Sequence, residues 1–253
     1  MFFKETNFKE TAVGRIPKDW NVAKVVELGE VVTGTTPSTF NKEYWDGEYP
    51  FITPTDITEI KYVEKTERQV TQKGVERGRL IPKYSVLVTC IASIGKIALA
   101  SEPCITNQQI NAIICREGVD PHYVYYATAF RSNILKTWAG RTTNPIVKKS
   151  LFEKFPLVLP KTENEQRTIA EVLSTVDEAI QKTSEVIGKT ERLKKGLMQE
   201  FFTKGIGHNQ FEDTEIGRIP KEWKVVRLGD HIELKSGLYF KFSEFTRTGV
   251  EQD

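Results

Sequence analysis

The sequence predicts a mixed α/β (α+β) domain followed by a long α-helix. Short β-branched runs separated by Gly, Pro and Asn turns fill most of residues 1–160 and predict strands. An apolar stripe at spacings of 3 and 4 then runs through residues 161–205 and predicts a helix of about 40 residues. With 39% apolar and 28% charged residues, the 253-residue chain has enough apolar side chains to form a folded core.

Strands are expected at five places, each a short apolar run bounded by turn residues. They are Ala23–Leu28, Tyr49–Thr53, Ser85–Cys90, Lys96–Ala100 and Ile110–Cys115. Residues 120–138 are expected to form a helix, with Asp120 as the N-cap. Pro121 suits the first helical position, and Gly140 follows the end of the helix.

The long helix is expected to begin in a capping box, in which Thr162 and Glu165 satisfy each other's backbone donors. Positive and negative side chains balance at eight each over residues 161–204, so this helix is not a polybasic arm. A single apolar stripe on a long, evenly charged helix predicts pairing with a partner helix. A helix lying along its own domain is the alternative. The expected dimerisation residues are Ile169, Leu173, Val176, Ile180, Ile187, Leu193 and Leu197.

A segment near the N-terminus recurs about 200 residues later. Residues 8–20 read FKETAVGRIPKDW and residues 211–223 read FEDTEIGRIPKEW, with eight of the thirteen positions identical. In each copy the glycine permits an unusual backbone angle, the proline favours an extended chain and the tryptophan supplies a large buried anchor. The second copy is therefore expected to open a second domain, of which residues 206–253 hold a linker and the truncated start.

Several kinds of active site lack their sequence motifs. The chain has no phosphate loop, no dinucleotide-binding turn and no HExxH, and its three cysteines and three histidines show no metal-ligand spacing. We therefore expect no catalytic residue, no metal and no cofactor. Ser93 and Lys96 match the SxxK spacing of a nucleophile and base, but without companion motifs we interpret them as a turn with a basic tip.

Nothing in the sequence predicts a membrane span or a secretory signal. No stretch approaches 18 consecutive apolar residues, and the first ten residues lack an apolar core and carry early acids. The unpatterned cysteines also argue against a disulfide framework. We expect a soluble, cytoplasmic protein that binds no membrane.

Four groups of segments follow one another in a fixed order along the chain. They are GRIPKDW at 14–20; GTTPS at 34–38 with YWDG at 44–47 and FITPTDI at 51–57; SIGK at 93–96 with TNQQ at 106–109; and LVLP at 157–160 with EQRTIA at 165–170 and KKGLMQ at 194–199. Together with the repeat, they resemble the specificity (S) subunit of type I restriction–modification enzymes, in a half-length or truncated form. The resemblance covers essentially the whole chain.

The resemblance implies a non-catalytic DNA-recognition subunit. S subunits usually carry two target-recognition domains, each followed by a long helix, and the two helices pair antiparallel. Each domain reads one half of an interrupted sequence in double-stranded DNA. Methyltransferase (M) subunits then methylate an adenine in each half, and a motor–nuclease (R) subunit joins for cleavage. The S subunit itself directs these partners.

Applied to this chain, the resemblance makes residues 1–160 a target-recognition domain and residues 161–205 the helix for dimerisation and M-subunit docking. With one complete domain and one unpaired stripe, the chain is expected to self-associate. A two-fold symmetric pair demands a palindromic site. Pairing with a different half-subunit stays open, as does the reason why the sequence stops at Asp253.

Basic side chains gather in residues 68–96 and 131–154, each against a single acid, although the net charge of the chain is only +2. Lys and Arg contact phosphates, whereas Arg, Asn and Gln suit base edges. A loop of small hydroxyl residues adds further candidates. The expected DNA-binding residues are Thr35, Thr36, Ser38, Arg77, Arg79, Lys96, Asn107, Gln108, Gln109, Arg141, Thr142, Thr143, Asn144, Lys148 and Lys149. The alternative is a solvated face with ordinary turns, and Asp56 is either a structural cap or a cytosine reader.

Two other functions stay open. The chain is alternatively a single-chain DNA methyltransferase or endonuclease fragment whose catalytic part is absent. In that case the purified chain alone would transfer methyl groups. It is also conceivable as a coiled-coil scaffold with no DNA role, in which case exchanging Lys148 and Lys149 for glutamate leaves DNA affinity unchanged.

Overall fold

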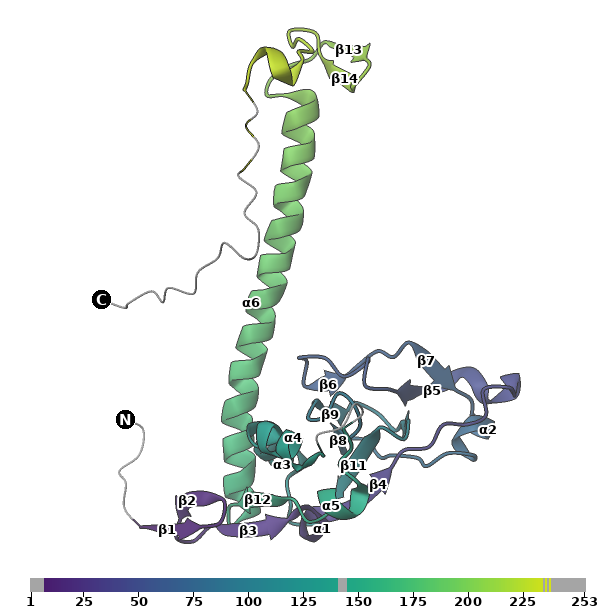
Figure 1. The fold of residues 1–253 in the computed structure, drawn as a ribbon, viewed down its shortest axis with the longest axis vertical. Coiled ribbons are helices and arrows are strands. Elements are labelled where there is room, and N and C mark those ends of the chain that lie inside the picture. The colour runs from purple at the N-terminus through teal and green to yellow at the C-terminus, as the bar shows by residue number, and fades with distance from the viewer. Residues whose placement is uncertain (1–6, 141–144, 234, 236, 238–253) are drawn as a thin grey trace. The chain divides into compact units, whose positions relative to one another are not determined.

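The computed structural model describes residues 7–140, 145–233, 235 and 237 (Figure 1). The predicted DNA-binding residues Arg141, Thr142, Thr143 and Asn144 lie outside the described residues. The chain forms two compact units, residues 1–184 and 185–253. The mixed α/β class with a long helix after a strand-rich domain is confirmed.

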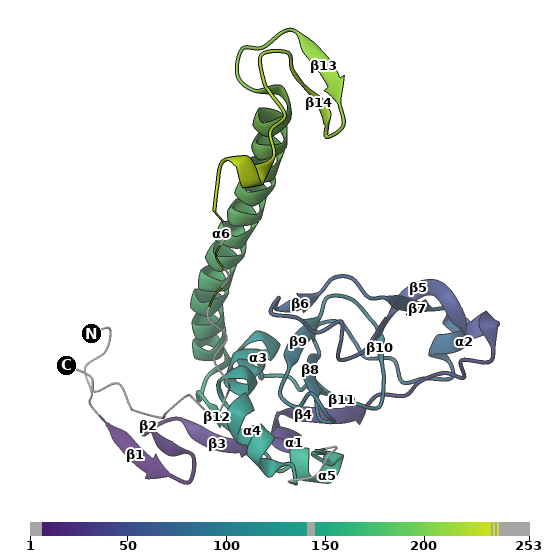
Figure 2. The ribbon, with the colours of Figure 1, turned by 45° about the horizontal axis from the view of Figure 1, so that its top comes forward.

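The first unit is built on a five-stranded sheet in the order β4–β11–β8–β9–β6 (Figure 2). Its strands are β4 (Gly29–Thr33), β11 (Ile110–Cys115), β8 (Val86–Thr89), β9 (Ile97–Ala100) and β6 (Tyr62–Val63). Adjacent strands pair antiparallel, except that β6 runs parallel to β9. All residues of β8 and β9 are buried, because both faces of the sheet are covered. The strands predicted at 85–90, 96–100 and 110–115 are confirmed within one residue at each end.

Alternate side chains of β8 enter different parts of the core. Val86 and Val88 pack with helices and with Phe152 and Phe155, whereas Leu87 packs on the opposite face. The helices are α3 (Pro121–Phe130), α4 (Ser132–Trp138) and α5 (Lys149–Phe152). A three-stranded sheet is formed by β10 (Ile105–Thr106), β5 (Trp45–Ile52) and β7 (Arg68–Val70), beside the short helices η1 (Lys42–Tyr44) and α2 (Gln72–Val75).

The strand predicted over Ala23–Leu28 is half wrong. Strand β3 (Asn21–Lys24) pairs with β12 (Pro156–Leu159), but the chain then forms the single helical turn α1 (Val25–Leu28). In this turn Val25 and Leu28 are fully buried at a spacing of three, which fits a helix and not an alternating strand. The apolar run alone did not distinguish these periods.

The helix predicted over residues 120–138 begins as expected and is interrupted at Arg131. Asp120 caps it, since its side chain accepts a hydrogen bond from the Tyr123 N–H at 2.8 Å, and Pro121 occupies the first helical position. Arg131 leaves the helical conformation, with ψ near 7°, and so separates α3 from α4. Its guanidinium donates to the carbonyl of Val13 at 3.4 Å, a tertiary contact that the sequence pattern does not report.

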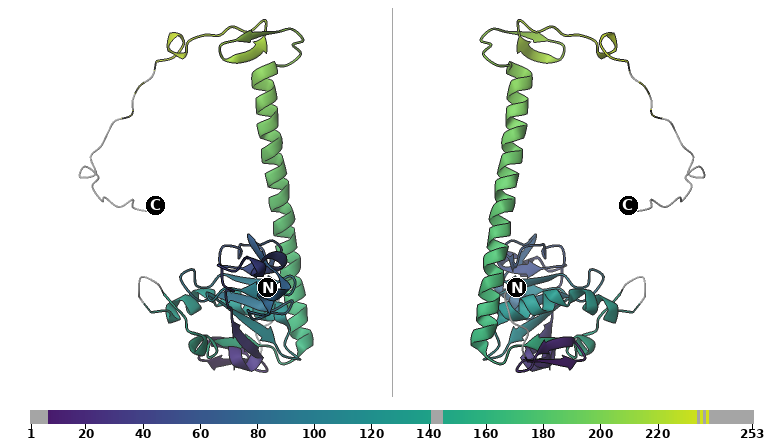
Figure 3. Two further views of the ribbon diagram at one scale, coloured as in Figure 1. Left: turned by 90° about the vertical axis from the view of Figure 1, so that its right-hand side faces the viewer. Right: turned by 90° about the vertical axis from the view of Figure 1, so that its left-hand side faces the viewer.

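The long helix α6 (Glu163–Lys204) has 42 residues and is drawn as one uninterrupted coil in Figure 3. The Oγ1 of Thr162 accepts the Glu165 N–H at 3.3 Å, as expected of a capping residue. In the predicted capping box, the Glu165 carboxylate would accept the Thr162 N–H. In the structure it accepts the indole N–H of Trp20 at 3.1 Å. Gly205 follows the helix with φ +68°, a conformation typical of a helix C-terminus, and this agrees with the predicted end near residue 205.

The two sequence repeats form matching β-hairpins. In the first unit β1 (Phe8–Thr11) pairs with β2 (Gly14–Pro17), and in the second β13 (Phe211–Thr214) pairs with β14 (Gly217–Pro220) in the same register. The turn glycines, Gly14 and Gly217, have φ of +108° and +113°, as their predicted role requires. The repeat tryptophans are half-buried and not fully buried as expected. The helical turn η2 (Leu228–Asp230) follows the second hairpin.

Candidate nucleic-acid interface

Three loops that carry seven of the eleven described DNA-binding candidates emerge at one end of the five-stranded sheet. Asn111 near the start of β11 lies opposite Thr33 at the end of β4, and Ile110 lies opposite Thr89 at the end of β8. Because β8 turns directly into β9, the turn between them emerges at the same end (Figure 2). We call this surface the loop end; it comprises residues 34–41, 90–96 and 107–109.

Polar side chains connect the loops of the loop end. The Thr36 hydroxyl donates to Gln108 Oε1 at 2.8 Å, which joins the loop after β4 to the loop before β11. Within the second loop, Asn107 Nδ2 donates to Gln109 Oε1 at 2.9 Å. These contacts hold the amide groups in fixed positions, and Gln108 is exposed. Amides held in this way can present donors and acceptors to base edges with little loss of side-chain entropy.

Thr35 differs from its neighbour Thr36. Its hydroxyl oxygen is buried without a hydrogen-bond partner among the described residues, while its N–H donates to the Thr106 carbonyl at 2.8 Å. The preceding Gly34 allows this close approach, since a Cβ there would lie 2.1 Å from the carbonyl oxygen of Asn107. Thr35 therefore shapes the loop, and its hydroxyl does not face solvent.

The candidate arginines and lysines flank the loop end. Arg79 Nη1 donates to the carbonyl of Thr33 at 2.8 Å, so this arginine lies at the end of β4, and Arg77 nearby is exposed. Lys148 and Lys149 are also exposed and follow Val147, whose N–H donates to the Cys90 carbonyl at 2.8 Å. The structure thus brings basic residues from both sequence clusters, Arg79 and Lys148 among them, to the same end of the sheet.

Lys96 makes contacts within the protein. Its ammonium group donates to the main-chain carbonyls of Pro54 at 3.1 Å and Ile57 at 3.2 Å. These bonds fix the segment that follows β5. Two of the three ammonium protons are thereby used, which leaves one for a phosphate. The SIGK turn itself has φ +85° at Gly95, in agreement with its interpretation as a turn with a basic tip.

Asp56 acts as a cap in this structure. Its Oδ2 accepts both the N–H and the hydroxyl of Thr53 at 2.7 Å, and its Oδ1 accepts the Glu67 N–H at 3.0 Å. Both carboxylate oxygens therefore have protein partners. This geometry favours the structural reading of Asp56 over the cytosine-reading one.

Phe40 is a surface feature that sequence reasoning missed. Its side chain is 97% exposed, at a turn closed by the Asn41 N–H donating to the Ser38 carbonyl at 3.3 Å. The Trp45 indole donates to the same carbonyl at 3.1 Å, so the turn is anchored to β5. A single exposed apolar side chain is ordinary on a protein surface, but this ring lies on an anchored turn of the loop end. The signal was an apolar residue inside the polar stretch 38–42.

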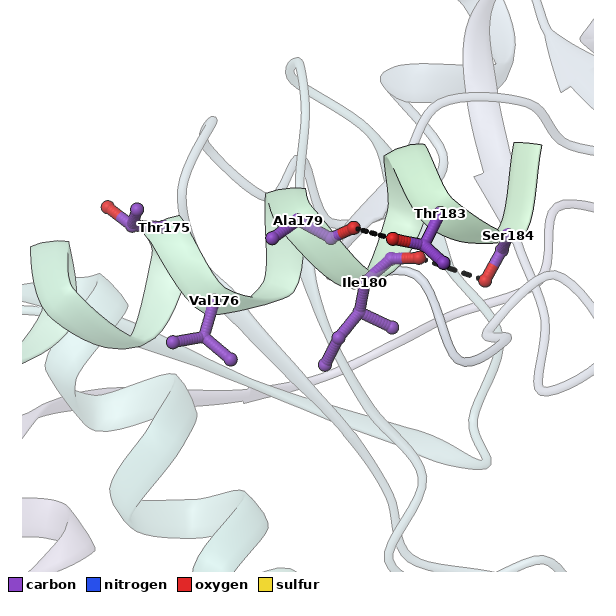
Figure 4. A pocket seen from close by; sticks show the side chains of 6 residues that line it. All are labelled: Thr175, Val176, Ala179, Ile180, Thr183 and Ser184. Carbon is purple, nitrogen blue, oxygen red and sulfur yellow. Dashed lines mark hydrogen bonds between the residues drawn. The ribbon is translucent and has the colours of Figure 1, made fainter. Parts of the chain in front are cut away.

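The predicted dimerisation stripe is uncovered along α6. Ile169 is half-buried, and the other six predicted residues are 38–61% exposed. Val176 and Ile180 project from the same side of the helix and border a shallow hollow (Figure 4). The hollow is also lined by the small residues Thr175, Ala179, Thr183 and Ser184. The hydroxyls of Thr183 and Ser184 donate to carbonyls one turn back, which lowers the polarity of this face.

The described ranges contain neither a group of metal-ligand side chains nor a helix able to span a membrane. There, no three His, Cys, Asp or Glu side chains are placed together so as to hold a metal ion. In the same ranges, every helix is too short or too polar to cross a membrane.

The fold and its loop end define a class of protein: a strand-rich domain with converging polar loops, followed by a long helix with an exposed apolar face. The sequence profile described as "Type I restriction modification DNA specificity domain" matches residues 17–189. The chain belongs to this family. The resemblance drawn from its motifs is thereby confirmed.

Curated relatives carry specificity-subunit names. The MjaIX type I restriction enzyme specificity subunit of Methanocaldococcus jannaschii is 40% identical over 246 residues, covering 92% of this chain and 56% of the relative. The MjaVIII specificity subunit of the same organism is 31% identical over 260 residues, covering 99% of this chain and 58% of the relative. This chain therefore spans a little over half the length of these relatives.

Solved structures share the fold. The HsdS subunit from Thermoanaerobacter tengcongensis aligns with a TM-score of 0.55 at 15% identity, over 76% of this chain and 47% of that one. The S subunit from M. genitalium aligns with a TM-score of 0.53 at 18% identity, over 72% and 46%. At these identities the likeness concerns the fold alone.

Proposed function

We propose that this chain is a DNA-specificity subunit of a type I restriction–modification enzyme, and that its loop end reads one half of an interrupted DNA site. The observation that carries the proposal is the convergence of polar and basic residues from separate segments at one end of the sheet. Membership of the specificity-domain family supports it. In this role the chain works in the cytoplasm, needs no cofactor and leaves methylation and cleavage to M and R subunits.

The roles of the loop-end residues follow from their chemistry. Arg77, Arg79, Lys148 and Lys149 are assigned to phosphates, because exposed cations suit backbone contacts. Arg79 also donates to a carbonyl and Lys149 also pairs with Glu153 at 3.6 Å, and both side chains stay exposed. Thr36, Ser38 and the amides of residues 107–109 are assigned to base edges. Phe40 is assigned to an apolar contact with a thymine methyl group or a base step.

Selection of bound DNA from a random pool, by this chain mixed with its M subunit, tests the proposal. We expect enrichment of a bipartite motif whose halves are related by a two-fold axis. Failure to enrich any motif, or methyl transfer by the purified chain alone, would overturn the assignment. The variant with Phe40 changed to alanine should lose preference at one step of each half-site, whereas Phe130→Ala, a control at another exposed aromatic, should not.

We further propose that two copies pair antiparallel through α6. Alternating steps of 4 and 3 run from Ile169 to Phe201 and are apolar towards both ends, while Thr183, Thr190 and Lys194 fall within the series. The antiparallel register that uses the whole series sets Ile169 opposite the partner's Phe201 and Leu173 opposite the partner's Leu197. The two-fold axis then lies at the level of Glu185, so the two copies of Val186 lie within about 3 Å of each other along the helix axis. The remaining faces of the paired helices are left for M subunits.

A matched pair of cysteine variants tests this pairing. Val186 and Val172 are both valines, are each 61% exposed and lie two heptads apart on the same face. In the antiparallel pair, a short bifunctional maleimide should cross-link the two copies of the Val186→Cys variant. The reagent should not cross-link the Val172→Cys variant, because the two copies of residue 172 lie about 40 Å apart at 1.5 Å per residue. Equal joining of both variants would indicate parallel helices, and joining of neither would indicate a monomer; either result overturns the antiparallel register. The parent chain, which keeps its three cysteines, is the background control for cross-linking.

A further inference from the structure

Lys61 joins three elements of the first unit. Its ammonium group donates to the hydroxyl of Ser174 on α6 at 2.6 Å and to the hydroxyl of Tyr126 on α3 at 3.4 Å. Its own carbonyl accepts the Leu99 N–H at 2.7 Å, which fixes Lys61 to the β9 edge of the sheet. A single residue therefore connects the sheet, through its carbonyl, with a packed helix and the long helix, through its side chain.

Tyr126 completes the cluster. Its hydroxyl donates to Asp177 Oδ2 on α6 at 2.6 Å, which places a carboxylate close to the Lys61 ammonium group. The ammonium nitrogen also lies 4.7 Å from the centre of the Tyr126 ring and 5.6 Å from that of Tyr62. Cation–π contacts and charge-assisted hydrogen bonds are stronger in such half-buried surroundings than in water. The cluster is thus a directional polar contact between the domain and α6.

The position of this cluster along α6 allows it to fix the angle between the domain and the helix. Among the described residues, other polar contacts between the domain and the helix lie in its first turn, where Trp20 meets Glu165 and the Asp120 N–H donates to Gln166 Oε1 at 2.9 Å. Ser174 and Asp177 lie about 14–18 Å further along, at 1.5 Å per residue. Contacts near the chain connection act as a pivot, whereas a contact two to three turns away fixes the angle.

We propose that Lys61, Tyr126 and Asp177 are positioning residues that set the angle between the recognition domain and α6, and so select the spacer length between two half-sites. The inference rests on the proposed function, since two domains read one bipartite site only if their separation matches the DNA. One base pair moves a half-site by 3.4 Å along the axis and rotates it by a tenth of a turn. A domain held at a fixed angle to α6 cannot readily follow a half-site that has moved and rotated in this way.

The test uses full-length Tyr126→Phe and Lys61→Met, with Tyr62→Phe as the matched control. The control removes a hydroxyl that contacts His122 and not α6. Binding is measured to DNA carrying one selected half-site, and to two half-sites at the best spacer and at one base pair more or less. We expect half-site affinity within about twofold of the parent for all chains. The preference for the best spacer should fall at least threefold in the two test variants alone.

The outcomes separate this inference from the proposed function. An unchanged spacer preference in Tyr126→Phe and Lys61→Met would overturn the positioning role and leave the proposed function intact. Equal loss on half-site and bipartite DNA would mean that the cluster only supports folding, which also overturns it. A parent chain that prefers no bipartite site over a half-site overturns the proposed function, and this inference with it.

Discussion

The indole of Trp20 donates to the carboxylate of Glu165 at 3.1 Å, across 145 residues of sequence. This bond joins the GRIPKDW segment to the first turn of α6. A carboxylate near a helix N-terminus is stabilised by the helix dipole, and here it also satisfies the N–H of a half-buried indole. The repeat segment is therefore part of the junction between domain and helix.

Replacing Trp20 by phenylalanine should weaken this junction. Loss of the hydrogen bond and of ring area should lower the free energy of unfolding by about 1 kcal/mol, measured by urea denaturation followed by circular dichroism. Trp223→Phe is the control, because that ring lies beside His208 in the second unit. Equal losses in both variants would contradict a specific role for the bond with Glu165.

Changing Lys148 and Lys149 together to glutamate should weaken DNA binding uniformly across sequences. If each lysine neutralises one phosphate, the slope of log affinity against log salt should become shallower by about 2. Titrations between 50 and 200 mM salt, about the range over which such slopes are usually read, measure this. The matched control replaces Lys182 and Lys189, which are exposed on α6, with glutamate. Unchanged affinity in the test variant would support the scaffold alternative.

Asp56→Ala should destabilise the first unit. Three donors lose their acceptor, and the expected cost is about 1–3 kcal/mol of unfolding free energy, measured by thermal or urea denaturation. Should Asp56 instead read cytosine, the variant would keep its stability and change its preference at one base of the selected site. Denaturation and repeated DNA selection on the same variant decide between the two.

Ile180→Asp should abolish self-association without unfolding the chain. Ile180 is 59% exposed, so its replacement removes little from the core of one chain but places a charge in the centre of the proposed helix pair. Sedimentation at micromolar concentration should show the parent as a dimer and the variant as a monomer with unchanged helicity. Glu178→Gln, on the charged side of the same turn, should remain a dimer.

Stability should fall in alkali because two thiols are buried and a third, that of Cys115, is half-buried. Burial raises the pKa of Cys90, Cys104 and Cys115 from 9.0 to about 12. Above pH 9 the unfolded chain loses these protons while the folded chain keeps them, so the stability present below pH 9 is lost as the pH rises towards 12. Urea midpoints measured from pH 8 to 11 should decline, and less steeply in Cys115→Ser. A flat profile would contradict the burial of these thiols.

Local patterns predicted the parts of the fold that depend on neighbouring residues. Asp120 and Pro121 marked a helix start because a cap acts within one turn, and Thr162 did so for α6. The strand at Ile110–Cys115 was predicted at both ends. Local patterns did not predict the interruption at Arg131, whose guanidinium contacts a carbonyl 118 residues away.

The candidate interface shows the same division. The sequence identified polar loops and basic clusters, but it did not indicate that they meet, since that depends on the register of β11 against β4 and β8. It also gave no sign that Thr35 turns inwards or that Lys96 bonds to carbonyls. Phe40 was overlooked because exposure is a property of the folded chain.

By itself, the sequence determined the repeat, the long helix with its unpaired stripe and the family to which the chain belongs, because these depend on residue order and on periods of a few residues. Tertiary structure alone decided which loops share the end of the sheet and how Lys61 connects that sheet to α6. The physical reason is distance along the chain. Contacts between residues more than 50 positions apart depend on how whole elements pack, and no local periodicity encodes that packing.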